Sequence, residues 1–490
     1  PRRWNPAWLL EATPPQDEPA AATAPLGTAL IGRDQELAAI RQFVAQQNGL
    51  LTLIGAAGIG KSHLLESART ETPNTSWFTC PCDETSTQTL LPFRHWLMDY
   101  FRQRPEETVA VNLAAFEARL EDLIQATAVA ELAAELNHLR SMLAALVDLA
   151  LPNSLYTRLK PEQRGENFRQ ALRALLKAES LLQPVVVHVE DGHWLDDDSR
   201  VLLESLLHHG NELRVAVVLD ARTQGFEPLK VHGVPAQTWR LAPFEAEAIT
   251  ALATHVLSES PTTELVSLLL EKGQGNPFYT EQILLYLREN GLVKDGRLIR
   301  SAATNINTLL PADVHNVLVS RLGQLDAAVQ EVVAQAAVLG QEFSVPVLSQ
   351  AVGAEQLQAS LQAGMDAAVW QPLGNGRYLF NHALLREAAV NTQFEEHKRE
   401  LHQKAARSVA KLATAERPHD AELAYHYDEA GDAHRAATHY LKAGDEAREN
   451  YFIREAHHYY SRGLALAQTK KQQLALLLGR EAVNHWLGNR

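Results

Sequence analysis

The segment Gly55-Ala56-Ala57-Gly58-Ile59-Gly60-Lys61-Ser62 has the residue types and spacing of a loop that binds phosphate. Its pattern, G-x-x-x-x-G-K-S, follows an apolar run at 50–54 and precedes a helical pattern that begins at Lys61. Glycines let backbone N–H groups approach phosphate without a Cβ atom in the way, and the helix start directs its positive dipole end at the same oxygens. Lys61 is expected to reach the β- and γ-phosphates, and the Ser62 hydroxyl to ligate Mg²⁺. We therefore expect ATP or ADP with Mg²⁺ here, with His63 also beside the nucleotide.

A second half of this site is expected at the end of the apolar run 185–189, where Glu190 and Asp191 follow. Ligands of a parallel sheet collect at the carboxyl ends of its strands. One carboxylate would support Mg²⁺ and the other would orient the attacking water, and their division of roles stays open. Arg222 follows another apolar run, 214–219, where it could contact the γ-phosphate. The alternatives are an acidic pair that only ends a strand and a solvated loop arginine.

The elements that position these residues alternate between apolar strands and amphipathic helices from Leu30 to about Arg222, which is typical of a parallel α/β sheet. Beyond about 240 the strand signal fades, apart from a hairpin expected at 369–380 with Gly-Asn-Gly at its tip. Helices before that hairpin indicate a winged-helix unit, and small and aromatic spacing near the end indicates tetratricopeptide-like (TPR-like) repeats. The expected domains are a Pro/Ala-rich linker at 1–27, a P-loop NTPase core at 28–240, a helical lid at 241–310, a winged-helix domain at 311–392 and TPR-like helical repeats at 393–490.

Composition narrows the classes of function. The 490 residues are 46% hydrophobic, which is enough for large buried cores, and 45 basic residues against 59 acidic ones give a net charge of −14. No clustered basic patch stands out, so direct binding of nucleic acid is not expected. Two cysteines form neither a disulfide framework nor a complete zinc site, and no long apolar run indicates a membrane span, so we expect a cytoplasmic protein. The first residue is Pro1, and we expect an upstream domain.

Several segments resemble the signal-transduction ATPases with numerous domains (STAND), a branch of the AAA-like NTPases. The segment 30–37, LIGRDQEL, resembles the family's GRExEL segment, and 190–196, EDGHWLD, resembles its DDLHWAD form of Walker B. Glu190 stands where Asp is commoner. Ala221-Arg222 resembles the family's sensor arginine. The resemblance implies that Ile31, Gly32 and Arg33 border the adenine or ribose.

Two later segments extend the resemblance. Gly275-Asn276-Pro277-Phe278 resembles the GNPF motif of the lid, which implies that Pro277 lies near the nucleotide base. The segment 380–387, FNHALLRE, resembles the MHD region, in which the histidine contacts the ADP β-phosphate in the resting state. Only His382 matches the motif here, because Asn381 stands in place of its Met and Ala383 in place of its Asp. The alternative is a histidine that only packs at the start of a helix.

The resemblance implies an ATP/ADP-binding switch that hydrolyses ATP slowly, assembles into a nucleotide-dependent homo-oligomer and meets an inducer or protein partner through its TPR-like region. Related cassettes occur in large LuxR-type transcription activators and beside adenylate cyclase domains. The alternative is a scaffold that keeps its nucleotide without hydrolysis. A working ring motor is a third reading, but it would need an arginine from a neighbouring subunit that we cannot identify in the sequence.

Overall fold

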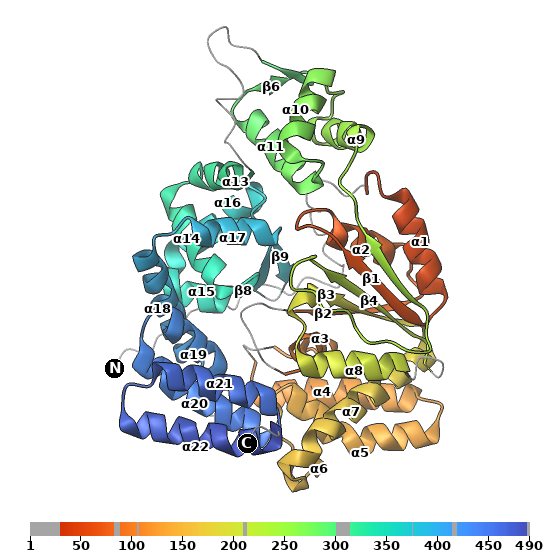
Figure 1. Cartoon of the computed structure of the whole chain (residues 1–490), viewed down its shortest axis with the longest axis vertical. Helices are drawn as coiled ribbons and strands as arrows, with labels where there is room; N and C mark the ends of the chain where they lie inside the picture. The colour runs from red at the N-terminus through yellow and green to blue at the C-terminus, as the bar shows by residue number, and fades with distance from the viewer. Residues whose placement is uncertain are drawn as a thin grey trace, which may run out of the picture.

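The computed structural model describes residues 30–82, 89–104, 107–208, 213–299, 314–374, 376–413 and 419–487. The linker predicted for 1–27 lies outside these ranges. Figure 1 shows four regions: a sheet with its flanking helices, a helical lid above it, a second helical unit beside it, and a stack of helices at the C-terminal end. In the described part of the chain, no helix is both long enough and apolar enough to cross a membrane.

The core is a five-stranded parallel sheet in the order β2-β3-β4-β1-β5. Its central strands carry apolar side chains on both faces and are buried along almost their whole length, as expected for a parallel sheet covered on both sides. The predicted α/β core is therefore confirmed. Its strands are β1 (Gly49–Ile54), β2 (Ser76–Pro81), β3 (Val185–Glu190), β4 (Val215–Ala221) and β5 (Ala236–Arg240).

Helices cover both faces of this sheet because alternate side chains of each strand point to opposite sides. α1 (Asp34–Ala45) and α2 (Lys61–Thr70) share one apolar cluster with Val186 and Val218. The opposite face packs against helices that include α8 (Asp197–His208). A helical insertion between β2 and β3 supplies the rest of that layer, namely α3 (Leu91–Tyr100), α4 (Val109–Ala126), α5 (Ala130–Leu146), α6 (Leu155–Arg158) and α7 (Pro161–Leu182).

The predicted lid region consists of α9 (Ala246–Leu257), α10 (Thr263–Gly273) and α11 (Pro277–Glu289) with a short hairpin of β6 (Val293–Lys294) and β7 (Arg297–Leu298). These helices share an apolar cluster that is separate from the cores of the sheet and that also includes Val317 of the following unit. The lid therefore stands apart from the apolar cores of the sheet but packs on the unit that follows it in the chain, and Figure 1 shows it above the sheet.

The next unit, residues 314–391, combines helices with a three-stranded antiparallel sheet in the order β8-β10-β9 around its own apolar cluster. The order of helices, a short strand, helices and a hairpin suits the predicted winged-helix domain, whose assignment stays a prediction. Its elements are α13 (Val314–Gly323), α14 (Ala327–Leu339), β8 (Glu342–Ser344), α15 (Val345–Val352), α16 (Ala354–Asp366), β9 (Trp370–Gly374), β10 (Arg377–Phe380) and α17 (Ala383–Asn391). We call this unit the arm.

The C-terminal region is helical, as predicted, and its helices pack in sequence order. They do not stand apart from the core: the ring of Phe452 lies 5.4 Å from that of Phe168 in α7, within one continuous apolar cluster. In Figure 1 the blue helices accordingly lie beside the orange ones. The helices are α18 (Glu395–Leu412), α19 (Asp420–Glu429), α20 (Ala433–Glu449), α21 (Ile453–Leu466) and α22 (Lys470–Leu487).

Candidate nucleotide-binding site

The predicted phosphate loop connects β1 to α2, as its sequence context requires. Gly58 and Gly60 have φ angles of 77° and 94°, a region in which a side chain would strain the backbone. A Cβ atom on Gly58 would also lie 2.9 Å from Oδ1 of Asn276. α2 begins at Lys61 directly after this turn, so its first N–H groups and the positive end of its dipole are at the loop. The backbone from 55 to 62 therefore fits a phosphate chain.

Lys61 is a buried cation whose hydrogen-bond acceptors, among the described residues, are backbone carbonyls. Its Nζ donates to the carbonyl oxygens of Gly55 at 3.0 Å and Ala56 at 3.1 Å, and only 8% of the residue is exposed. Burial lowers the pKa of Lys61, while the carboxylates of Asp220 and Asp191 act in the opposite direction. A buried ammonium group of this kind fits an anionic ligand such as a phosphate group.

Glu190 and Asp191 end β3 next to α2, as predicted. The Ser62 hydroxyl donates to Oε1 of Glu190 at 3.5 Å, which brings the two proposed metal ligands together. Burial, and then the nearby charge of Asp220, raises the pKa of Glu190 to about 7 and that of Asp191 to about 6. Three carboxyl groups are thus crowded at one edge of the sheet, and a divalent cation would relieve their repulsion.

Mg²⁺ would fit this edge through few protein ligands. Among the described residues, no group of three or more His, Cys, Asp or Glu side chains has an arrangement that could hold a metal ion. Mg²⁺ commonly binds one or two protein oxygens and completes its shell with phosphate oxygens and water. Ser62 and Glu190 satisfy that requirement, with Asp191 beside them as the other proposed ligand.

Sequence reasoning missed a buried pair behind these carboxylates, His188 and Asp220. Nε2 of His188 lies 2.9 Å from Oδ2 of Asp220, and both residues are buried. Oδ1 of Asp220 also accepts a hydrogen bond from the backbone N–H of Asp191 at 3.4 Å. That contact tethers Asp191, whose φ of 51° is unusual for a residue other than glycine. The signal was present in the sequence, because each of these polar residues interrupts or ends a β-branched run.

Arg222 follows the end of β4 and is paired with a residue of the arm. Its Nη2 donates to Oε1 of Glu387 in α17 at 3.0 Å. Burial raises the pKa of Asp191 and lowers that of His193. The positive charge of Arg222 opposes the first shift and adds to the second, which is consistent with a guanidinium group close to the acidic edge of the sheet. No local sequence pattern identified Glu387, since its partner lies 165 positions earlier in the chain.

The lid motif rests directly on the phosphate loop. The Nδ2 group of Asn276 donates to the carbonyl of Ala57 at 2.8 Å, and the N–H of Phe278 donates to the carbonyl of Gly58 at 3.3 Å. Pro277, predicted near the base, has its Cγ 3.9 Å from the position that a Cβ on Gly60 would occupy. These contacts place the first turn of α11 against the cradle.

His382 joins the arm to this lid contact. Its ring stacks on Phe278 with 3.8 Å between centroids, and its Nδ1 accepts the N–H of Leu384 at 3.1 Å, which caps α17. Burial, followed by the charges of Lys61 and Arg222, lowers the pKa of His382 to about 3. The imidazole is therefore neutral at physiological pH, with its proton on Nε2 because Nδ1 is an acceptor. The structure thus brings the predicted histidine near the loop lysine.

The predicted adenine neighbours lie at the junction of loop and lid. Arg33 is buried and donates to the carbonyls of Ala242 at 2.6 Å and Ile59 at 3.5 Å, with its guanidinium over the ring of Phe244. A Cβ atom on Gly32 would come within 2.8 Å of the Ala248 side chain in α9. Two other residues were predicted beside the nucleotide. Ile31 directly precedes Gly32 and is half-buried. His63 lies in α2, and burial lowers its pKa.

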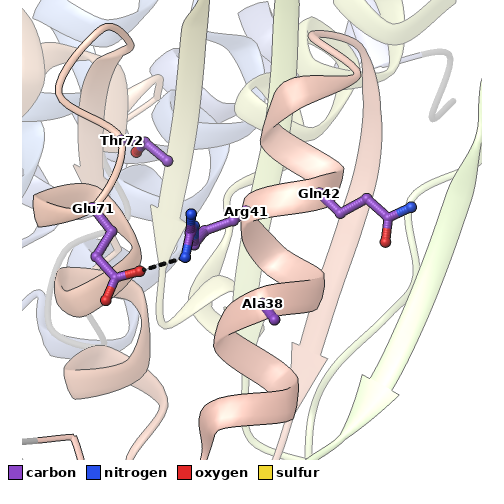
Figure 2. Close-up of a pocket in the computed structure, with 5 residues that line it drawn as sticks. All are labelled: Ala38, Arg41, Gln42, Glu71 and Thr72. Atoms are coloured by element: carbon purple, nitrogen blue, oxygen red, sulfur yellow. Dashed lines mark ion pairs between the residues drawn. The ribbon is translucent and has the colours of Figure 1, made fainter.

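A surface hollow of about 520 Å³ lies between α1 and α2, lined by Ala38, Arg41, Gln42, Glu71 and Thr72 (Figure 2). Its one ion pair, Arg41 with Glu71 at 3.1 Å, joins two exposed side chains and adds little stability. Glu71 follows the C-terminal end of α2, and a ten-residue helix is about 15 Å long. The hollow is therefore at the end of α2 that is remote from Lys61.

Comparisons with known proteins agree with this geometry. Residues 29–218 match the AAA ATPase domain family. An uncharacterized protein of Rhizobium meliloti (strain 1021) is 28% identical over 469 residues, which are 90% of this chain and 43% of that protein. The chain therefore spans less than half of the length of this curated relative.

A solved structure shares the fold of most of this chain. The crystal structure of a Signal Transduction ATPase with Numerous Domains (STAND) protein with a tetratricopeptide repeat sensor, from Pyrococcus horikoshii, matches with a TM-score of 0.50 and 14% identity. The match covers 94% of this chain and 62% of that one. The Walker-type ATPase of Pyrococcus abyssi matches 74% of this chain and 96% of its own at 14% identity, but its TM-score of 0.32 supports no conclusion. The family match and the shared fold confirm the predicted resemblance: the chain carries an AAA-type ATPase domain, a nucleotide-binding class, within the fold of a STAND-class P-loop ATPase.

Proposed function

We propose that this chain is an ATP/ADP-dependent switch of the STAND type, in which slow Mg²⁺-dependent hydrolysis of ATP resets the conformation. The observation that carries the proposal is that groups from three regions meet at one cradle. Lys61 comes from the core, Phe278 from the lid and His382 from the arm. A nucleotide bound there would touch every region whose position it is proposed to control.

In this proposal the residues have separate tasks. Residues 55–60 and Lys61 hold the phosphate chain, and Ser62 holds Mg²⁺ together with Glu190 or Asp191. The bound nucleotide supplies the phosphoanhydride bond that is hydrolysed. Either Glu190 or Asp191 orients the attacking water, and a raised pKa suits a carboxyl group that accepts a proton near neutral pH. Arg222 binds the γ-phosphate when ATP is present.

The arrangement of the lid and arm supports the ADP state as the resting one. The lid is hydrogen-bonded to the carbonyls of Ala57 and Gly58, and His382 stacks on that lid with its Nε2–H as a donor. We propose that this donor binds the diphosphate and that exchange for ATP releases the arm. Ile31, Gly32 and Arg33 would then border the adenine or ribose, and Pro277 would lie near the base.

The released state is proposed to assemble into a homo-oligomer, and a protein partner or inducer bound to the TPR-like region, 393–490, would bias the exchange. The regulatory output in the proposal is activation of transcription or control of a linked cyclase. It rests on the resemblance of the motifs alone.

A scaffold that keeps its nucleotide unhydrolysed is the second candidate, and one experiment separates it from the switch. Purified protein is titrated with ADP and ATP by calorimetry, and phosphate release is followed with and without Mg²⁺. Lys61→Ala should abolish binding, whereas Lys230→Ala, an exposed lysine of the same domain, should bind as the wild type does. Binding with turnover that the first variant loses supports the switch, and binding without turnover supports the scaffold. Absence of binding by the wild type would overturn both.

A further inference from the structure

Arg222, which the proposed function assigns to the γ-phosphate, is paired with the carboxylate of Glu387 in this structure. One member follows strand β4 of the core and the other lies in α17 of the arm. Their side chains are 30% and 37% exposed, so the pair is accessible from solvent and can exchange partners. Guanidinium groups bind carboxylate and phosphate oxygens through the same planar N–H donors. A carboxylate at 3.0 Å is therefore a competitor for the same donors.

The position of this pair shows that Glu387 belongs to the cradle and not to a remote surface. Arg222 follows β4, the neighbour of the strand β3 that ends at Glu190, so its bond to Glu387 at 3.0 Å brings that carboxylate to the acidic edge of the sheet. Burial raises the pKa of Tyr279 in the lid, and the same two charges act on it, with Glu387 adding to the rise and Arg222 opposing it. A γ-phosphate bound to Lys61 would bring further negative charge into this group.

We propose that Glu387 is a specificity-determining residue, which satisfies Arg222 in the absence of a γ-phosphate and thereby favours ADP over ATP. ATP must displace this carboxylate to use Arg222, whereas ADP leaves the ion pair intact. The diphosphate state then keeps α17 on the core, and the triphosphate state loses one of the contacts that hold it there. The inference rests on the proposed function and adds to it the residue that makes the site distinguish the two nucleotides.

The stack of the His382 ring on Phe278 helps to hold the competing carboxylate of Glu387 beside Arg222. His382 is the residue that caps α17, and Glu387 follows it within the same helix. Because one short helix carries both contacts, displacement of Glu387 and movement of His382 are coupled. By linkage, each movement favours the other by the same free energy.

The test compares affinities for ADP and for a β,γ-imido analogue of ATP in Glu387→Gln. The uncharged amide is nearly isosteric, so the fold should be retained, and unchanged circular dichroism and elution volume would establish this. The expected result is that preference for ADP over the analogue falls about two- to fivefold, the range for a partly exposed ion pair. The matched control, Glu396→Gln, changes an exposed glutamate of α18 and should leave the preference unaltered.

A double-mutant cycle makes the result specific. In an Arg222→Gln background, Glu387→Gln should no longer change the preference, because the competed donor is gone. An unchanged ratio in Glu387→Gln, or an equal change in both backgrounds, would overturn the inference while leaving nucleotide binding intact. If the wild type binds neither nucleotide, it is the proposed function that fails, so the two failures are distinguishable.

Discussion

Replacing Glu455 by Gln should remove a pH dependence from the contact between the C-terminal helices and the ATPase core. Glu455 lies in α21, is 8% exposed, and its Oε2 accepts the backbone N–H of Thr89 at 2.6 Å, just before α3 begins. Asp196, close behind the Walker B strand, accepts the next N–H, that of Leu90, at 3.2 Å. The same turn is thus held by one carboxyl group from the repeats and one from the core.

The magnitude follows from the pKa of Glu455. Burial raises it from an ordinary value of 4.5 to about 7, although the hydrogen bond from Thr89 and the charge of Arg94 oppose the rise. The folded state therefore holds this proton more tightly than the open state does, so the contact is most stable below pH 4.5. Its stability falls as the pH rises and levels off above about 7. At about 1.4 kcal/mol for each pH unit, the loss is at most roughly 3 kcal/mol.

Amide hydrogen exchange read by mass spectrometry measures this local opening without assuming that a multidomain chain unfolds in one step. Peptides from α21 and from α3 are compared at about pH 5 and about pH 8, after correction for the intrinsic pH dependence of exchange. The wild type should lose protection in both segments at the higher pH, and Glu455→Gln should show much less change. Other carboxyl groups with a raised pKa, such as that of Glu281, remain in both proteins and cancel in the comparison. Equal pH dependence in the two proteins would refute the reasoning.

Two further variants test contacts within and between regions. A Cβ on Gly479 would lie 2.5 Å from the buried ring of Tyr460, so Gly479→Ala should destabilise the repeats by about 1–3 kcal/mol and lower their melting temperature. Gly165→Ala is its control: the nearest atom would be 3.7 Å away, and the helix propensity of alanine should raise stability by up to about 1 kcal/mol. Asn276→Ala removes both the cap of α11 and the bond to Ala57, at a cost of about 1 kcal/mol, and should speed exchange in residues 277–289. Unchanged exchange there would show that the lid does not depend on this contact.

The sequence predicted the parts of the site that are built locally. A Gly-rich turn between a strand and a helix imposes its own backbone geometry, so residues 55–62 could be placed from the pattern alone. The acidic pair 190–191 followed from its position at the end of an apolar run. The parallel sheet was predicted for the same reason, because the buried strands are continuous apolar segments. These features depend on neighbours in the chain.

The contacts that join the regions could not be predicted in this way. Arg222 and Glu387 are far apart in the chain, and neither position needs the other for its local structure. His188 and Asp220 are each visible in the sequence as a polar residue within an apolar run. That their side chains meet depends on the register of β3 against β4, which the sequence does not give. The attachment of the repeats to α7 depends on which exposed face of each helix meets the other, and periodicity alone does not choose between such faces.

The distribution of apolar contacts indicates which regions can separate when the nucleotide changes. The arm and the lid are joined by apolar contacts, because the lid cluster includes Val317 of the arm and Phe278 of the lid packs on the arm cluster. The arm touches the core through polar pairs such as Arg222–Glu387 and Arg377–Asp99, both partly exposed. Such pairs contribute little stability and exchange readily with water. The repeats, in contrast, share one continuous cluster with the core at Phe168, and separating them would expose apolar surface at a higher cost.

α18 links these two behaviours. It packs on α14 and α15 of the arm and on α19 of the repeats, so the arm cannot move far while the repeats stay on α7 unless contacts along α18 give way. Weak polar contacts on one side and a large apolar contact on the other imply that nucleotide exchange alone loosens the arm but does not free it. A partner that competes for the face of the repeats now held by α7 would remove the larger constraint. In the proposed switch, partner binding and nucleotide exchange would therefore act on the same movement, with α18 as the element through which they are coupled.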